Sequence, residues 1–265
     1  MQAKTLRFND AVLQYTVSGE GNTVMLVHGF GEDSNIWNGL ADKLAANYKL
    51  IIPDLPGSGS STILSAEKTG ITDYAESLHA ILENEQVKKL TMIGHSLGGY
   101  ITLAFAEKYS HLLDAFGLFH SSAYADDAEK KATRKKAIEF IQQNGSVAFL
   151  KTSIPGMFAN PDHSKTDIDV LIQGAGNFKP AALIQYYEAM LNRPDRTEVL
   201  QTFSLPIMFI LGTQDKAVPL ELGLKQSHLP AISHIHILES GHMGMLEQPE
   251  NSLLKITHFL SSVYV

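Results

Sequence analysis

Ser96 lies in a pattern that is typical of a catalytic nucleophile. Gly94-His95-Ser96-Leu97-Gly98 fits the Gly-x-Ser-x-Gly elbow, in which a strand turns sharply into a helix and holds the central serine strained and exposed. At the two flanking positions the turning backbone passes too close to its neighbours to accept a Cβ, so glycine is the residue that fits. A serine hydroxyl is a poor nucleophile at neutral pH and needs a histidine base, which in turn needs an orienting carboxylate. The motif therefore predicts two partners elsewhere in the chain.

Asp215 and His242 are the predicted partners. Each follows an apolar run, residues 207–211 before Asp215 and residues 235–238 before His242. Their order along the chain, serine then acid then histidine, is the order expected with an elbow of this type, and it differs from the orders of the chymotrypsin and subtilisin families. We therefore predict Ser96 as the nucleophile, His242 as the base and Asp215 as the acid that orients it.

A glycine-rich turn after the apolar run 23–27 is the predicted oxyanion site. His28-Gly29-Phe30-Gly31 leaves backbone N–H groups free where a central strand ends. Seen alone, the turn also fits an ordinary strand-to-helix connection. With the elbow downstream, the backbone N–H groups of Phe30 and Leu97 are predicted to form the oxyanion hole.

The other motifs point to no cofactor and no metal ion. His28 and His95 lie beside the expected site, where packing or hydrogen bonding behind the catalytic groups suits them better than catalysis. No His-Glu-x-x-His or comparable ligand spacing occurs. The loop Pro53–Ser61 contains Gly-x-Gly but has neither the lysine of a P-loop nor a third glycine at Rossmann spacing, so phosphate binding is not predicted.

Strand and helix patterns alternate along the first half of the chain. Apolar runs at 23–27, 49–52, 90–93 and 112–119 are separated by stretches with helical spacing, which predicts an α/β fold with a parallel sheet and right-handed crossovers. The rhythm changes after residue 120, where helices are predicted at 126–143, 147–152, 168–173 and 180–191. Sheet patterning returns at residue 207. We therefore predict a core domain of residues 1–120 and 204–265, with a helical cap of residues 121–203 over the site.

Composition restricts the classes of partner. The net charge of −7 lacks the basic footprint of a protein that binds nucleic acid by phosphate neutralisation. The chain has no cysteine, which removes disulfides, thiolate zinc sites and a cysteine nucleophile. The N-terminal residues lack the apolar core of a signal peptide, and no run approaches the roughly 18 apolar residues of a membrane span. A cytoplasmic protein without membrane or nucleic-acid partners is expected, as a monomer or a homodimer.

Taken together, these motifs resemble the α/β-hydrolase superfamily, and the capped carboxylesterases in particular. The resemblance is carried by His28–Gly31, Asp54–Ser61, Gly94–Gly99, Gly212–Asp215 and Gly241-His242. It implies an eight-stranded, mostly parallel sheet with an antiparallel second strand, flanking helices, a helical cap inserted after the sixth strand, and no cofactor. Haloalkane dehalogenases and epoxide hydrolases of this fold use an aspartate at the elbow, so Ser96 disfavours those reactions.

The expected function is hydrolysis of a small or medium carboxylic ester through an acyl-enzyme, with water as the second substrate. Carbon–carbon bond hydrolysis, thioester or lactone hydrolysis and cofactor-free perhydrolysis use the same triad and stay open as alternatives. A small-molecule receptor with a hydrolase fold is an alternative of another class.

Overall fold

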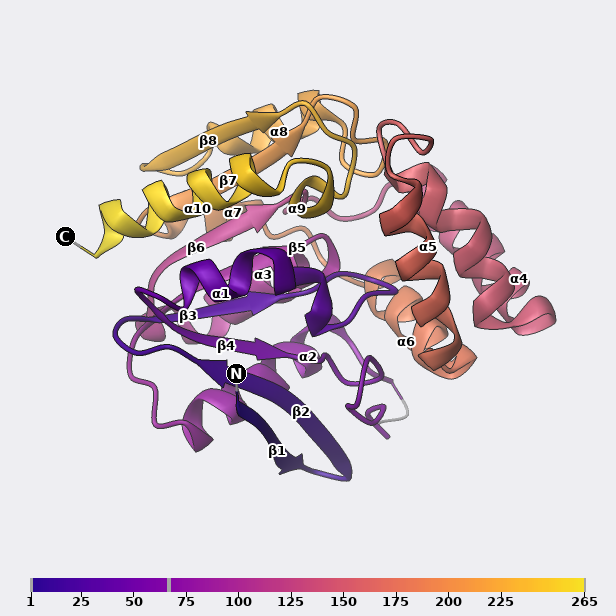
Figure 1. The fold of residues 1–265 in the computed structure, drawn as a ribbon, viewed down its shortest axis with the longest axis horizontal. Helices are drawn as coiled ribbons and strands as arrows, with labels where there is room; N and C mark the ends of the chain where they lie inside the picture. Colours follow the sequence, from indigo (N-terminus) through magenta and orange to yellow (C-terminus); the bar gives the residue numbers. More distant parts are fainter. Residues whose placement is uncertain (1, 66–67, 265) are drawn as a thin grey trace.

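A single eight-stranded sheet organises the chain (Figure 1). The computed structural model describes residues 2–65 and 68–264. The strands are β1 (Gln2–Phe8), β2 (Ala11–Ser18), β3 (Thr23–Val27), β4 (Lys49–Pro53), β5 (Leu90–His95), β6 (Leu113–Phe119), β7 (Ile207–Gly212) and β8 (Ser233–Leu238). Their order in the sheet is β1-β2-β4-β3-β5-β6-β7-β8. Strand β2 pairs antiparallel with β1 and β4, and the remaining neighbours are parallel. The predicted mostly parallel sheet with an antiparallel second strand is confirmed.

The burial of each strand follows from its apolar pattern. Every residue of β3 and β5 is buried, as expected for continuous apolar runs in strands that are covered on both faces. Strand β2 alternates instead, with Ala11, Leu13 and Tyr15 buried and Val12 exposed. This alternation is typical of a strand at the margin of the sheet, where one face meets water.

Helices connect the strands and cover the sheet. They are α1 (Asn38–Leu44), α2 (Ile71–Asn84), α3 (Leu97–Tyr109), α8 (Leu220–Ser227), α9 (Gly244–Glu247) and α10 (Pro249–Val263), with short 3-10 helices η1 (Ser34–Trp37) and η2 (Ser110–Leu112). Helix α1 packs against α10, and α2 packs against α3. The segments that follow the carboxyl ends of β3, β5, β7 and β8 carry the residues predicted to do the chemistry.

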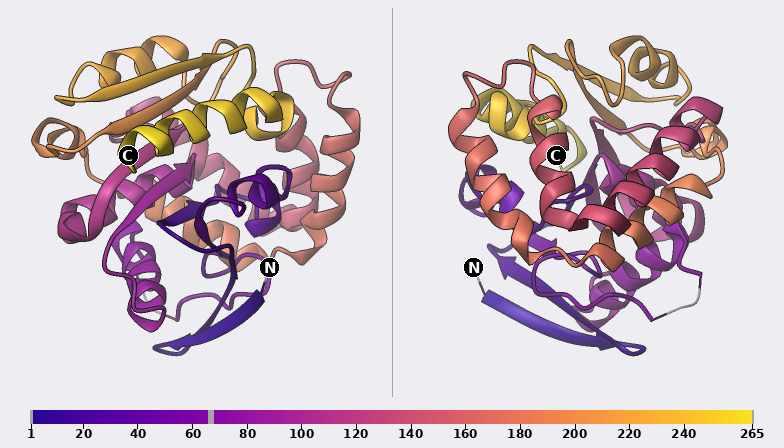
Figure 2. Two further views of the ribbon diagram at one scale, coloured as in Figure 1. Left: turned by 60° about the vertical axis from the view of Figure 1, so that its left-hand side comes forward. Right: turned by 90° about the vertical axis from the view of Figure 1, so that its right-hand side faces the viewer.

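Four further helices lie between β6 and β7 in the sequence. They are α4 (Ala128–Ser153), α5 (Lys165–Gly174), α6 (Pro180–Leu191) and α7 (Thr197–Thr202), with η3 (Ile154–Met157) and η4 (Ala175–Asn177) between them. Helices α4, α5 and α6 gather at one end of the molecule, on the side to which the arrowheads of β3 and β4 point (Figure 1), and they face the viewer in the right-hand view of Figure 2. The predicted helices at 126–143 and 147–152 are two arms of α4, which is kinked at Gly145 (φ 82°, ψ 170°). The division of the chain into a core and a cap stays a prediction.

None of the helices in residues 2–65 and 68–264 combines the length and the apolar composition that crossing a membrane requires.

Candidate active site

Ser96 lies at the turn between β5 and α3, in a conformation that few residues adopt. Its backbone has φ 51° and ψ −114°, and a positive φ is uncommon for residues other than glycine. The Ser96 amide donates to the Phe119 carbonyl at 2.9 Å, and the Ser121 hydroxyl donates to the Ser96 carbonyl at 2.7 Å. These bonds to the end of β6 hold the strained turn and leave the half-buried Ser96 side chain facing a pocket.

Close packing at this turn leaves no room for a side chain at Gly94 or Gly98. A Cβ on Gly94 would lie 2.2 Å from the Gly98 carbonyl oxygen, and a Cβ on Gly98 would lie 2.4 Å from the carbonyl oxygen of Val27. Neither glycine has a positive φ. The close approach expected from the sequence is therefore confirmed, and conformational freedom is not the reason for these two glycines.

The structure brings Ser96, His242 and Asp215 together from the turns after β5, β8 and β7. The Nε2 atom of His242 lies 2.8 Å from the Ser96 Oγ, and its Nδ1 atom lies 3.0 and 2.9 Å from the two carboxylate oxygens of Asp215. An ionised carboxylate only accepts hydrogen bonds, so Nδ1 carries the proton and Nε2 is left to accept the Ser96 hydroxyl proton. The three residues thus form one hydrogen-bonded chain that ends at a partly exposed hydroxyl.

Asp215 is held in its ionised form. Burial by itself would raise the pKa of this carboxyl, but the neighbouring His242 more than offsets that effect and holds the pKa well below its usual range. The amides of Ala217 and Val218 also donate to Oδ1, at 2.8 and 2.9 Å. A carboxylate with this many donors is fixed in orientation and charge, which suits it to orienting His242.

Ser96 and His242 open into a pocket of about 460 Å³. Its other lining residues include Phe30, Tyr100, Met157, Tyr187, Met190 and Val218. Charged side chains, among them Lys130 and Arg134, also line it. A pocket of this size that combines apolar and polar groups can hold a small molecule. Met157, Tyr187 and Met190 come from the helical segment between β6 and β7, so this segment shapes the pocket.

The backbone amides of Phe30 and Leu97 are free of protein acceptors among the residues that the structure describes. Leu97 begins α3, where the amides of the first turn have no partner within the helix. The Phe30 ring packs against that of Tyr187, with the centroids 4.3 Å apart. Both amides are thus available to an acceptor bound in the pocket.

The loop that carries His242 is tied to the segment that follows α4. The His242 amide donates to the Met157 carbonyl at 2.7 Å. The Glu247 carboxylate accepts from the amides of Gly241 and Ala159 at 2.9 and 2.8 Å. No local sequence pattern indicates these contacts of Met157 and Glu247, because the two segments that they join lie more than 80 residues apart.

His28 and His95 make hydrogen bonds behind the site, as expected. His28 Nε2 accepts from the Leu55 amide at 2.9 Å, and its Nδ1 lies 2.8 Å from the Gly29 carbonyl. His95 Nε2 lies 2.9 Å from the His242 carbonyl. Neither is assigned the role of the base.

His120, at the end of β6, is a second histidine beside Asp215. Its Nδ1 lies 3.1 Å from the Asp215 Oδ2, but neither ring nitrogen is aligned for a hydrogen bond. The residue is fully buried and has a φ of 48°. Burial lowers the pKa of His120 to about 4, so the ring is neutral at pH 7.

His120 should make stability depend on pH. Its pKa is about 4 in the folded protein and 6.5 for an unperturbed histidine, so the unfolded chain binds more protons between these values. Stability is therefore expected to fall by about 3 kcal/mol from this group as the pH drops from 6.5 to 4. Asparagine tolerates a positive φ and does not titrate, so denaturant unfolding of His120→Asn should show a flatter pH dependence than the wild type. If the free energy of unfolding changed equally with pH in the two proteins, this account would be contradicted.

His120, Asp215 and His242 offer ligand atoms within 4.8 Å of one another, a spacing that a metal ion can use. In this arrangement His242 uses one ring nitrogen for Asp215 and the other for Ser96. It therefore has no free lone pair for a metal, and we assign a hydrogen-bonded chain to these residues.

Comparisons with known proteins agree with the fold. A family model described as the alpha/beta hydrolase fold matches residues 22–132, which include the turn of residues 28–31 and the elbow of residues 94–98. A solved structure of a thermophilic esterase from Thermogutta terrifontis, with malate bound, superposes with a TM-score of 0.93 and 25% identity over 100% of both chains.

Two curated relatives are similar over most of their length. The pimeloyl-[acyl-carrier protein] methyl ester esterase of Aeromonas salmonicida is 25% identical over 252 residues, which cover 91% of this chain and 96% of the relative. Lipase 3 of Moraxella sp. is 26% identical over 233 residues, which cover 86% and 73%. The resemblance inferred from the motifs is confirmed for the fold: this chain has the α/β-hydrolase fold.

Proposed function

We propose that the protein is a serine hydrolase that cleaves a small or medium carboxylic ester through an acyl-enzyme intermediate. In this proposal Ser96 is the nucleophile, His242 the general base, Asp215 the orienting acid, and the amides of Phe30 and Leu97 form the oxyanion hole. The observation that supports it most is the hydrogen-bonded chain from Asp215 through His242 to the Ser96 Oγ, with distances of 2.9 and 2.8 Å. The names of the similar proteins, two esterases and a lipase, agree with it.

Acylation uses the geometry around Ser96. Its Oγ attacks the carbonyl carbon of the ester while its proton passes to His242 Nε2. The carbonyl oxygen becomes negatively charged and accepts hydrogen bonds from the amides of Phe30 and Leu97, which stabilise it. The carbon–oxygen bond to the alcohol then breaks, and the alcohol leaves with the proton from His242.

Deacylation repeats these steps with water. His242 Nε2 takes a proton from the water, whose oxygen attacks the acyl carbon. The bond to Ser96 Oγ breaks, the hydroxyl regains its proton from His242, and the carboxylic acid departs. Asp215 keeps His242 in the tautomer that accepts at Nε2, and it stabilises the imidazolium that forms in both halves of the reaction.

The helical segment of residues 121–203 is proposed as a cap that selects the substrate. It supplies Met157, Tyr187 and Met190 to the pocket, and the pocket volume of about 460 Å³ suits a small or medium ester.

Burst kinetics on p-nitrophenyl esters of increasing acyl length, with wild type and Ser96→Ala in parallel, test the proposal. The wild type is expected to release a burst of p-nitrophenol followed by steady turnover, and Ser96→Ala is expected to show neither. The acyl length with the highest kcat/KM then indicates the size of the acyl group that the pocket accommodates. Turnover that persists in Ser96→Ala, or a wild type inactive on every ester, would overturn the proposal and favour the carbon–carbon hydrolase or receptor alternatives.

A further inference from the structure

Glu32 and His95 form a buried pair that the catalytic steps above do not use. The Glu32 Oε2 lies 3.0 Å from the His95 Nδ1, and the side chains are 4% and 0% exposed. The same carboxylate oxygen accepts the Gly29 amide at 2.7 Å. On the far side of the imidazole, His95 Nε2 lies 2.9 Å from the His242 carbonyl. Two side chains thereby connect three segments that are far apart in the sequence.

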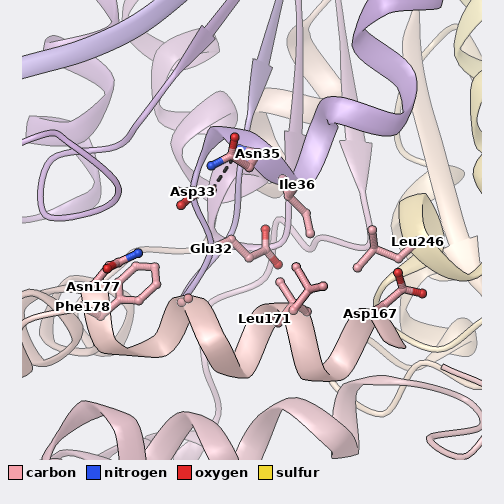
Figure 3. Close-up of a pocket in the computed structure, with 12 residues that line it drawn as sticks. Glu32, Asp33, Asn35, Ile36, Asp167, Leu171, Asn177, Phe178 and Leu246 are labelled. Atoms are coloured by element: carbon pink, nitrogen blue, oxygen red, sulfur yellow. Dashed lines mark hydrogen bonds between the residues drawn. The ribbon is translucent and has the colours of Figure 1, made fainter. Parts of the chain in front are cut away.

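A second pocket of about 240 Å³ lies on the outer side of this pair. Figure 3 shows Glu32 in that pocket, on the same turn as Asp33 and beside Ile36 and Leu171. Although Glu32 lines this pocket, its side chain is almost fully buried, so solvent does little to screen its charge.

With Glu32 ionised, the hydrogen-bond partners of His95 require a proton on both of its ring nitrogens. A backbone carbonyl only accepts hydrogen bonds, so the Nε2 that faces the His242 carbonyl must carry a proton. An ionised Glu32 also only accepts, so the Nδ1 that faces it must carry a proton as well. A neutral imidazole has a single N–H and satisfies only one of these two acceptors. The geometry therefore fits an ionised Glu32, which also accepts the Gly29 amide, beside an imidazolium at His95.

Local electrostatics agree with this assignment. Burial opposes both charges, yet the facing His95 holds the pKa of Glu32 below its usual range, and the facing Glu32 raises the pKa of His95. Asp215 adds to the effect on His95, and His28 adds to the effect on Glu32.

Other ionisable groups lie on both sides of the pair, toward the candidate active site and toward the outer pocket. The rings of His242 and His120 lie 5.0 and 6.2 Å from the ring of His95, measured between centroids. Asp33 and Asp167 line the outer pocket together with Glu32.

We propose that Glu32 and His95 are a buried carboxylate–imidazolium pair that positions the oxyanion turn, the elbow and the His242 loop relative to one another. Glu32 holds the oxyanion turn through the Gly29 amide, one residue before Phe30. His95 is the elbow residue before Ser96, and it holds the backbone of His242. This inference rests on the proposed function, because it assigns a role to the pair in that same site.

The packing at Gly29 supports the assignment independently. A Cβ on this residue would lie 2.9 Å from the His95 Nδ1 and 3.1 Å from the Glu32 Oε2. Glycine at position 29 therefore allows the pair to form directly against the oxyanion turn. Both residues act through other groups and touch no reacting atom, so they are positioning residues.

Glu32→Gln tests the charge with little change of shape. A glutamine oxygen still accepts the Gly29 amide, but a neutral side chain no longer favours the imidazolium, and His95 loses one of its two N–H bonds. We expect kcat for an active ester to fall by about 10²-fold with KM within about threefold of wild type, since misplacing catalytic groups by about 1 Å costs this much. The matched control is Asp33→Asn, which removes one charge from the next residue and keeps the oxygen that accepts the Asn35 amide. Equal kcat values for Glu32→Gln and Asp33→Asn would overturn the inference.

A double-mutant cycle with His95→Gln separates a functional pair from two independent defects. If the residues act as one unit, the double variant Glu32→Gln/His95→Gln should lose about as much kcat as the worse single variant. If the fold losses in kcat of the two single variants multiply in the double variant, the residues act separately and the inference is overturned.

A spectroscopic measurement on the wild type tests the charge of His95 directly, and the variants serve only to assign the signal. At pH 8 an ordinary histidine, with a pKa of about 6.5, is neutral. The ¹⁵N spectrum of histidine-labelled protein at this pH should contain one imidazolium, which disappears in His95→Gln and in Glu32→Gln but persists in Asp33→Asn. A neutral His95 at pH 8 would overturn the inference. An imidazolium at His95 in a protein whose ester turnover survives Ser96→Ala would instead overturn the proposed function and leave the pair intact.

Discussion

His242→Ala is expected to lower kcat for ester hydrolysis by about 10⁶-fold, the loss seen when the base of a serine protease triad is removed. Nε2 of His242, 2.8 Å from Ser96 Oγ, is the acceptor in place to take the serine proton. Without it, Ser96 stays a protonated alcohol at neutral pH, and the leaving alcohol has no acid to protonate it. Single-turnover measurements with a p-nitrophenyl ester report this loss directly on the acylation step.

His258→Ala is the matched control, since it removes an exposed histidine on α10, a helix that does not line the pocket. Its kcat should equal that of the wild type. The assignment of His242 would be wrong if the alanine variant kept more than a small fraction of wild-type activity, or if the two variants lost activity equally.

Asp215→Asn is expected to lower kcat by about 10⁴-fold while the protein stays folded. The amides of Ala217 and Val218 donate to Oδ1, so the asparagine oxygen is expected to occupy that position and its NH₂ group to face His242. The Nδ1 of His242 must then accept a proton instead of donating one. This moves the ring proton to Nε2, and Nε2 can no longer accept from Ser96.

The measurement is kcat against pH for Asp215→Asn and for Asp114→Asn, a half-buried control on β6 whose partner is Lys89. The control should follow the wild type at every pH. Because the asparagine forces the wrong tautomer, the rate of the Asp215 variant should rise at high pH, where a stronger base in solution replaces His242. A wild-type profile for Asp215→Asn would remove this residue from the mechanism.

The elbow, the strands and the order of the triad could be predicted from the sequence because their signals are local. A strand-to-helix turn with a serine at its apex needs glycines at fixed spacing, and the contacts that a Cβ would make at Gly94 and Gly98 give the reason. Buried strands are likewise indicated by continuous apolar runs, and Asp215 follows the buried β7. His242 follows β8, an apolar run whose residues Ile235 and Ile237 are exposed in the structure. Within each segment the neighbouring residues carry the necessary information.

Contacts between distant segments were decided by the tertiary structure alone. Glu32 and His95 are 63 residues apart, and no local sequence pattern links them. Their pairing depends on the register of β3 against β5. The contact of Met157 with His242 depends in the same way on how the helices after β6 fold back over the sheet. The sequence by itself therefore determined the candidate catalytic residues and the elements that carry them. The tertiary structure decided which buried charges meet behind the site and which side chains line the pocket, because these contacts join segments with no shared local pattern.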